Sequence, residues 1–527
     1  MPDRLRPLDT SFLVMESAST PMHVATLDIF EAPDGLDYER VVALINDRIA
    51  FVPRYRQRVR WLPGRLGNPV WTDDEDFDLL YHVRRSALPR PGSMEQLRDL
   101  VARIMSRRLD RSRPLWETYL VEGLEGGRYA ILSKSHQALV DGTTVDLGQL
   151  IVDDTPDAAE TPDVAWTPER QRGAVELLGE AVTEAIRNPS VAADQLRGQV
   201  ITMRSAAERA LGLASGVTGR APAHTGPLMT DLSEQRRFAT VETRLADYRR
   251  VRQEHGGSVN DVILTTVAGA FRAWLLTRAE SVSSATRIRA LVPMSVVDDE
   301  FAEPTSLGSQ VTPHMLSLPV GEASPVMRLH QVSYAFKAHK ETGRAVAANK
   351  LAEIAGFAPT TLHAIGSRVA ARHSPRSYQL LITNVPGPQF PLFAAGARML
   401  ASYPVQPLVP DHALAIGATS YDGKVFYGLH ADRDAMPDLD VLAACIVEAL
   451  DELVDASSSS RPRAPRGRVS PKQSQGVEGA IPQPSRRRTS STSRATRSAL
   501  APERTDKKST AGTAKTVAKK AAKKKDS

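Results

Sequence analysis

The sequence predicts an α/β fold, because segments with strand character alternate with segments of helical spacing along its 527 residues. In the first half, an alternating apolar run at 25–30 precedes a helical pattern at 38–49. In the second half, strand-like runs at 288–293 and 378–383 follow a long helical pattern. With 42% hydrophobic residues, the chain is long enough to bury sizeable cores in two or three domains.

Capping and turn signals separate these elements. Thr167-Pro168 combines an N-cap with a proline at the first helical position, and Ser258 or Asn260 can cap the long helix of the second half. Asp261, in the first turn of that helix, also suits the helix dipole. Further strands are expected at 118–122, 128–136, 307–316, 413–418 and 424–430, and further helices at 93–109 and 437–454.

Candidate acid/base chemistry lies at one corner, between residues 134 and 146. The strand pattern 128–136 ends at His136, and Asp141-Gly142 is a turn signal. Thr143 followed by Asp146 is a capping signal for a short helix. The sequence therefore places an imidazole where a strand turns into a helix.

The corner reads His136-Gln137-Ala138-Leu139-Val140-Asp141-Gly142. It resembles the His-His-x-x-x-Asp-Gly hallmark of the bacterial wax ester synthase/diacylglycerol acyltransferase family. Further strings that resemble this family occur in the family's order between residues 8 and 453. They are 8–12, 20–24, Pro114-Leu115-Trp116, Asn260-Asp261-Val262 and Asn384-Val385-Pro386-Gly387-Pro388.

The resemblance implies two chloramphenicol-acetyltransferase-like α/β halves around a central tunnel. The expected division is an N-terminal half at 1–152, a connection with amphipathic helices at 153–237, a C-terminal half at 238–455 and a disordered basic tail at 456–527. The resemblance also implies an O-acyltransferase that moves a long-chain acyl group from acyl-CoA to diacylglycerol, giving triacylglycerol, or to a long-chain alcohol, giving a wax ester. Acyl-CoA is then a substrate, and we expect no cofactor and no metal.

The resemblance further assigns roles to single residues. The second histidine of the hallmark is taken to be the general base, and Gln137 occupies that position here with an amide that has no useful basicity. His136 is the remaining imidazole of the motif and the candidate catalytic residue. Adjacent strand residues point to opposite faces, so His136 can take this role only if the strand bulges or ends early. Asp141 is implied as an organiser of the loop, Gly142 permits the turn, and Asn260, Asp261 and Asn384 form the motif of the second half.

Two functions remain open at this point. One is a diacylglycerol O-acyltransferase that uses His136, and the other is a catalytically weak or silent protein of the same fold that binds acyl chains or lipid. The sequence contains no Gly-x-Ser-x-Gly elbow, no Gly-x-x-x-x-Gly-Lys phosphate loop, no His-Glu-x-x-His zinc helix and no dinucleotide fingerprint. No other catalytic pattern therefore competes with these two.

The charge is distributed unevenly along the chain. The formal net charge of +6 combines +15 on residues 461–527 with −9 on the remainder. The basic tail is expected either to be solvated or to contact anionic lipid or nucleic acid. Apolar stripes between 167 and 213 are expected to pack on a protein core, and an exposed stripe would instead make an interfacial anchor.

We expect a cytoplasmic protein that associates peripherally with membrane or lipid droplets. No continuous apolar segment typical of a secretory signal follows residues 1–7, and the single cysteine, Cys445, suits a reducing compartment. The longest apolar candidate, 262–276, contains Arg272 and falls short of the roughly 20 residues that a spanning helix needs. Contact with lipid would then occur at a surface.

Overall fold

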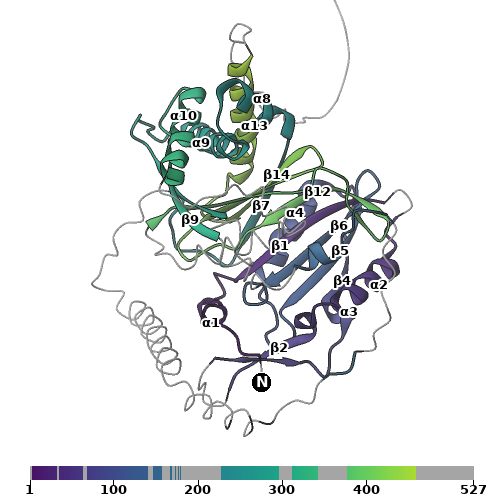
Figure 1. Ribbon diagram of the computed structural model, residues 1–527. Helices are drawn as coiled ribbons and strands as arrows, with labels where there is room; N and C mark the ends of the chain where they lie inside the picture. Colours follow the sequence, from purple (N-terminus) through teal and green to yellow (C-terminus); the bar gives the residue numbers. More distant parts are fainter. Residues whose placement is uncertain are drawn as a thin grey trace, which may run out of the picture. The chain divides into compact units, whose positions relative to one another are not determined.

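The computed structural model describes residues 3–32, 35–62, 68–140, 146–156, 166–168, 227–295, 311–341 and 377–458, with residues 173, 176 and 179. All of these belong to one compact unit, Met1–Ala464, which is distinct from Pro465–Ser527. Two six-stranded sheets and one two-stranded sheet, accompanied by helices, confirm the predicted α/β class (Figure 1).

The first sheet carries the predicted corner and has the strand order β11-β12-β1-β6-β5-β4. Its strands are β1 (His23–Glu31), β4 (Val83–Ala87), β5 (Trp116–Leu124), β6 (Arg128–His136), β11 (Phe393–Ala394) and β12 (Ala397–Val405). β1 and β6 pair antiparallel in a continuous register, from His23 opposite His136 to Glu31 opposite Arg128. Because directly opposite residues share a face of the sheet, His23 and His136 are neighbours.

The remaining elements of the first half pack around this sheet. They are α1 (Pro7–Met15), α2 (Tyr38–Ile49), the 3-10 helix η1 (Pro53–Arg56), β2 (Gln57–Arg60), β3 (Val70–Asp73), α3 (Leu79–His82), α4 (Met94–Ser106) and α5 (Leu147–Leu150). The bounds of α2 and β6 match the sequence prediction. Ser93 begins α4 through a capping box with Gln96, which is why this helix starts at Met94.

The second sheet has the order β7-β14-β13-β10-β8-β9. Its strands are β7 (Arg236–Arg244), β8 (Ile288–Ser295), β9 (Val311–Leu318), β10 (Leu380–Pro386), β13 (Leu414–Tyr421) and β14 (Lys424–Asp432). The helices of this half are α8 (Leu245–His255), α9 (Val259–Thr277), α10 (Pro325–Glu341) and α13 (Leu439–Ser457). Figure 1 shows α8, α9, α10 and α13 gathered on one side of this sheet.

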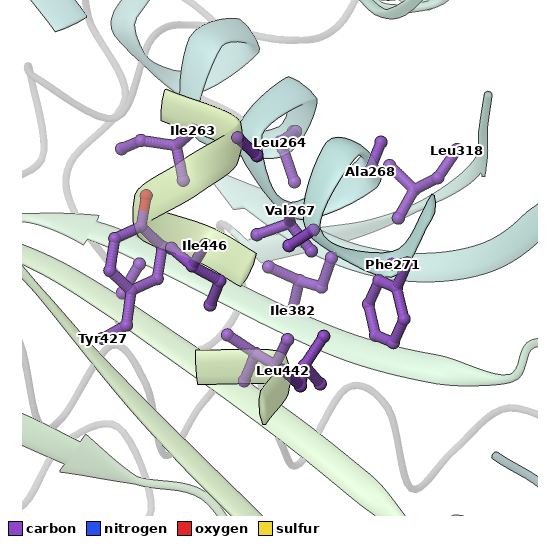
Figure 2. Close-up of a cluster of buried hydrophobic side chains, with 14 of the residues drawn as sticks. Ile263, Leu264, Val267, Ala268, Phe271, Leu318, Ile382, Tyr427, Leu442 and Ile446 are labelled. Carbon is purple, nitrogen blue, oxygen red and sulfur yellow. The ribbon is translucent and has the colours of Figure 1, made fainter. Parts of the chain in front are cut away.

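A core of buried side chains joins these helices to the second sheet (Figure 2). Val267 and Phe271 of α9 lie beside Ile382 of β10 and Ile446 of α13, all between 0 and 1% exposed. By length and composition alone α9 could cross a membrane, but 72% of its apolar window is buried inside the fold. Its apolar character is therefore accounted for by this core.

Strand β12 departs from the predicted division of the chain. It pairs with β1, from Ala25 opposite Val405 to Phe30 opposite Met399, so residues 393–405 belong to the first sheet and not to a separate C-terminal half at 238–455. A Cβ on Gly428 of β14 would lie 1.9 Å from the carbonyl oxygen of Pro404. Only glycine permits this close approach, by which β12 also packs against the second sheet.

Strand β10 extends beyond the predicted run at 378–383. Asn384-Val385-Pro386 pairs in register with β13, up to Pro386 opposite Ser420. The apolar stripes between 167 and 213 and the basic tail from 459 onward lie outside the described residues. The central tunnel stays a prediction.

Candidate active site

The corner is held by hydrogen bonds of its own backbone. β6 ends at His136, and the Ala138 N–H donates to Nδ1 of His136 at 2.9 Å. The Leu139 N–H donates to the His136 carbonyl at 2.9 Å, and the Gln137 N–H donates to the Met22 carbonyl at 2.8 Å. The strand thus ends at His136, its predicted bound, and its pairing with β1 is continuous and has no bulge.

The carboxylate of Glu16 lies beside both imidazoles of the corner. Glu16 is the residue at which α1 ends, and its Oε1 is 3.0 Å from Nε2 of His23 and 3.9 Å from Nε2 of His136. Arg111 donates through Nε to Glu16 Oε2 at 2.8 Å and also through Nη2. We refer to Glu16, His23 and His136 as the Glu16 cluster. Each of its three side chains is 1% exposed.

Burial and charge set the protonation of this cluster. Burial alone would raise the pKa of Glu16, but the hydrogen bond from His23 and the charges of the imidazoles and of Arg111 hold that pKa well below its ordinary value. The pKa of His23 is lowered to about 3, by burial first and then by the charge of Lys134, against the opposing effect of Glu16. At neutral pH Glu16 is therefore ionised and His23 is neutral.

The hydrogen-bond pattern also decides which nitrogens carry hydrogen. Nδ1 of His136 accepts from Ala138, so in the neutral ring Nε2 carries the hydrogen and faces Glu16. The ligand atoms of the Glu16 cluster lie within 4.8 Å of one another. A metal on Nε2 of His136 would require a hydrogen on Nδ1, which could then not accept from Ala138. The arrangement fits proton handling and not metal binding.

Of the other motif residues in the first half, the structure describes Gln137 but not Asp141 or Gly142. Gln137 is 1% exposed and follows directly on the end of β6. Asp141 and Gly142 lie outside the described residues, and so does Thr143. The helix after the corner begins at Leu147, and its N-cap is Asp146, whose side chain accepts from the Gly148 N–H at 3.0 Å.

The motif of the second half is brought together around the start of α9. Asn384 of β10 donates through Nδ2 to Oδ1 of Asn260 at 2.9 Å. Asp261 forms a capping box with Ser258 and accepts from the Ser333 hydroxyl at 3.0 Å. Of the two caps that the sequence allowed, Ser258 is the one used. The structure therefore gathers Asn260 with Asn384, whereas Asp261 holds the helix start.

Sequence comparison matches two family domains to this chain. Residues 5–263 match the wax ester synthase/diacylglycerol acyltransferase catalytic domain, and residues 307–454 match the C-terminal domain of the same proteins. The chain belongs to the wax ester synthase/diacylglycerol acyltransferase family. The solved wax ester synthase/diacylglycerol acyltransferase of Marinobacter aquaeolei has 26% sequence identity to it and a TM-score of 0.59, covering 86% of this chain and 99% of the other.

Named relatives of this acyltransferase family member come from mycobacteria. The probable diacylglycerol O-acyltransferase tgs1 of Mycobacterium tuberculosis is 32% identical over 471 residues, which is 89% of this chain and 99% of that protein. The probable diacylglycerol O-acyltransferase tgs3 of the same species is 43% identical over 264 residues, which is 48% of this chain and 97% of that protein. The similarity to tgs1 thus spans most of this chain.

Sequence reasoning missed two members of the cluster in this acyltransferase family member. The string 20–24, which contains His23, was used only as a resemblance to the family, and no role was predicted for His23 or Glu16. The register of β1 on β6 is the signal that brings His23 opposite His136. Glu16 gives no local signal, because only the packing of the end of α1 places it there.

Two buried carboxylates, those of Asp28 and Asp146, lie near the corner. Asp28 of β1 and Asp146 both face Gly148, where a Cβ would lie 3.2 Å from Oδ1 of Asp146 and 3.4 Å from Oδ2 of Asp28. Burial raises the pKa of Asp28 to about 7, the charge of Asp146 raises it as well, and a hydrogen bond from Ser402 opposes both. Burial also raises the pKa of Asp146 to about 7, against hydrogen bonds from the Gly148 and Leu147 backbone.

We expect Asp28→Asn to stabilise the protein at pH 8. The folded-state pKa of Asp28 lies above its unfolded value of 3.8. The protonated Asp28 therefore contributes its full share of the free energy of unfolding below pH 4, and this share is lost as pH rises toward 7. The neutral amide of Asp28→Asn does not ionise, so the variant avoids this loss. We expect its free energy of unfolding to exceed that of the wild type by about 2 kcal/mol at pH 8 and to equal it near pH 4. Urea unfolding at both pH values measures it, with exposed Asp47→Asn as the control. A gain that is equal at both pH values would contradict the assignment.

Proposed function

We propose that this protein is a diacylglycerol O-acyltransferase that moves a long-chain acyl group from acyl-CoA to diacylglycerol and makes triacylglycerol. The observation that carries the proposal is the family match, supported by a relative that aligns over 99% of its own length and bears this activity in its name. Long-chain alcohols, giving wax esters, are the second acceptor class that the family name indicates. No cofactor is required, because the thioester already carries an activated acyl group.

The reaction needs a proton acceptor near the acceptor hydroxyl. The hydroxyl oxygen attacks the thioester carbonyl, the carbon–sulfur bond breaks, and the proton of the alcohol ends on the departing thiol. We assign this proton transfer to His136, with Glu16 stabilising the imidazolium at 3.9 Å. In the resting arrangement Nε2 of His136 already carries a hydrogen. His136 can therefore take a proton only at Nδ1, and only after the hydrogen bond from the Ala138 N–H to Nδ1 has opened. Asp141 is proposed to organise the loop around it.

That hydrogen bond is also the observation that favours a second candidate function. With Gln137 at the usual base position and Nδ1 of His136 engaged by Ala138, the corner can be interpreted as a structural turn without a base. The protein would then bind acyl chains or lipid and turn over slowly or not at all. The two candidates make different predictions for one substitution.

The deciding experiment measures acyl transfer from a long-chain acyl-CoA to diacylglycerol for the wild type and for Gln137→His. If the proposal is right, the wild type forms triacylglycerol, and the added imidazole changes a rate that already exists. An inert wild type that gains activity on Gln137→His would instead identify a silent member of the family. Binding of the acyl-CoA, measured in the same preparations, separates loss of chemistry from loss of substrate.

We also propose that the protein works at the cytoplasmic surface of a membrane or lipid droplet. Diacylglycerol is dissolved in lipid, and the one helix of the described residues with the length and composition to span a membrane is a core helix. The basic tail would add electrostatic attraction to anionic lipid, which weakens as salt concentration rises. Nucleic acid is the other polyanion that this tail could contact.

A further inference from the structure

An arginine-rich cavity lies next to the Glu16 cluster. It has a volume of about 540 Å³, and its wall contains Arg84, Arg107, Arg108 and Arg111. Glu16 is part of the same wall and lies 3.9 Å from Nε2 of His136. The cavity therefore shares Glu16 with the cluster to which we assign the chemistry, and of its four arginines only Arg111 has a role there, as the partner of Glu16.

Internal ion pairs neutralise half of these arginines. Arg84 pairs with Glu117 at 2.9 Å, and Arg111 pairs with Glu16. The third wall carboxylate, Asp110, accepts from the Ser112 N–H at 2.9 Å and from the Tyr81 hydroxyl at 3.4 Å.

With four arginines and three carboxylates (Glu16, Asp110 and Glu117), the wall keeps one net positive charge, which lies with Arg107 and Arg108. Both are exposed, and within the described ranges of the chain no ion pair joins either of them to a carboxylate. The cavity thus offers two guanidinium groups to a ligand, and planar guanidinium groups match the oxygen atoms of a phosphate ester.

The segment that carries these two arginines is fixed from below. Lys134 of β6, which is 1% exposed, donates through Nζ to the Ile104 carbonyl at 2.9 Å and to the Arg107 carbonyl. These contacts anchor the backbone directly after α4. Lys134 is two residues before His136 on the same face of β6, so one strand positions both the arginine segment and the imidazole.

We propose that this cavity binds phosphate esters through Arg107 and Arg108, and that the phosphate groups of the acyl-CoA donor occupy it during acyl transfer. The phosphates of CoA are linked to its thioester by a flexible pantetheine arm, so a cavity that shares Glu16 with the cluster can hold the charged part while the thioester reaches the corner. This assignment rests on the proposed function for its choice of ligand. Diacylglycerol carries no phosphate, so the cavity discriminates donor from acceptor.

The first test measures binding without turnover. Calorimetric titration of CoA into the full-length protein should give affinity about 10-fold or more weaker for Arg107→Ser/Arg108→Ser than for the wild type, because two charge-assisted contacts are lost. Arg103→Ser is the matched control, because Arg103 is also exposed and near the end of α4 but does not line the cavity. Equal CoA affinity in the double variant and the wild type overturns the proposal.

Two further ligands separate the possible sources of phosphate. Adenosine 3′,5′-bisphosphate carries phosphates of the CoA type without the acyl arm, and vesicles with phosphatidic acid present the same group on a lipid. We expect the nucleotide to compete with CoA in the wild type and to lose affinity in the double variant. If the double variant loses only vesicle binding and keeps CoA affinity, the site belongs to a phospholipid headgroup and the donor assignment fails.

Kinetics distinguish failure of this site from failure of the proposed function. In an active enzyme, the double variant should raise KM for acyl-CoA about 10-fold, and the difference from wild type should disappear with acyl-pantetheine, which lacks phosphate. Normal turnover with unchanged KM overturns the cavity proposal and leaves the acyltransferase standing. If the wild type is inert but its CoA binding still depends on Arg107 and Arg108, the acyltransferase function is overturned and the cavity proposal stands.

Discussion

His136→Asn is expected to lower acyl transfer by about 100-fold or more while leaving the protein folded. The asparagine side-chain oxygen can still accept the Ala138 N–H that Nδ1 accepts at 2.9 Å, so the turn after β6 keeps its hydrogen bond. The amide cannot take a proton, and the imidazolium that Glu16 would stabilise cannot form. Initial rates of triacylglycerol formation with saturating acyl-CoA measure the effect.

His136→Ala serves as the companion variant, because it removes both the basic nitrogen and the acceptor for Ala138. It should lose the same activity and, in addition, some stability. His330→Ala is the matched control, since His330 is exposed on α10. Full activity in His136→Asn would show that His136 only holds the turn, and the proton acceptor would then have to be sought elsewhere.

Glu16→Gln is expected to destabilise the protein by about 3 kcal/mol at pH 7, because it leaves two buried imidazoles and the partly exposed Arg111 without their carboxylate. The wild-type contribution follows from a depressed carboxyl pKa. It is present above the unfolded value of 4.5 and is lost as pH falls through the folded-state pKa. Urea unfolding at pH 7 and at a series of pH values below 4 should show the stability difference between wild type and variant shrinking toward acid.

The same substitution should also reduce acyl transfer by about 10-fold or more at a temperature where the variant is folded, because His136 loses the carboxylate that stabilises its charged form. Glu39→Gln is the control, as Glu39 is exposed in the first turn of α2. A stability loss without any change in kcat would make Glu16 purely structural. Because the contribution fades mainly below pH 4, a loss that is the same at pH 7 and at the lowest pH where both proteins fold would show that the ionisation of Glu16 is not what matters.

Local patterns were sufficient for several elements of this fold. The apolar spacing of α2 and the alternation of β6 predicted both with their observed bounds, because a one-sided helix and a half-buried strand leave a period in the sequence. Capping predicted the start of α9 with Ser258 or Asn260 as the cap, because a cap depends on residues only a few positions apart, and the structure uses Ser258. The motif strings predicted the family, and the two domain matches confirm it.

Other elements had no local signal. Strand β12 joins the first sheet by pairing with β1, more than 360 positions earlier in the sequence, and which edge a strand pairs with is decided by packing of the whole unit. The N-cap of α5 is Asp146 and not Thr143, because the carboxylate is buried under the corner beside Asp28. Both residue types are good N-caps, so the local sequence could not decide which of them begins α5.

By itself, the sequence determined the family, the α/β class, the position of the corner at the end of β6 and the departure from the hallmark at Gln137. Only the tertiary structure decided what surrounds His136. Glu16 arrives from the end of α1, His23 from the facing strand and Arg111 from the segment after α4, and each is placed by contacts across long stretches of chain. Protonation depends on burial and on the charges within a few ångströms, and these quantities exist only once the chain is folded.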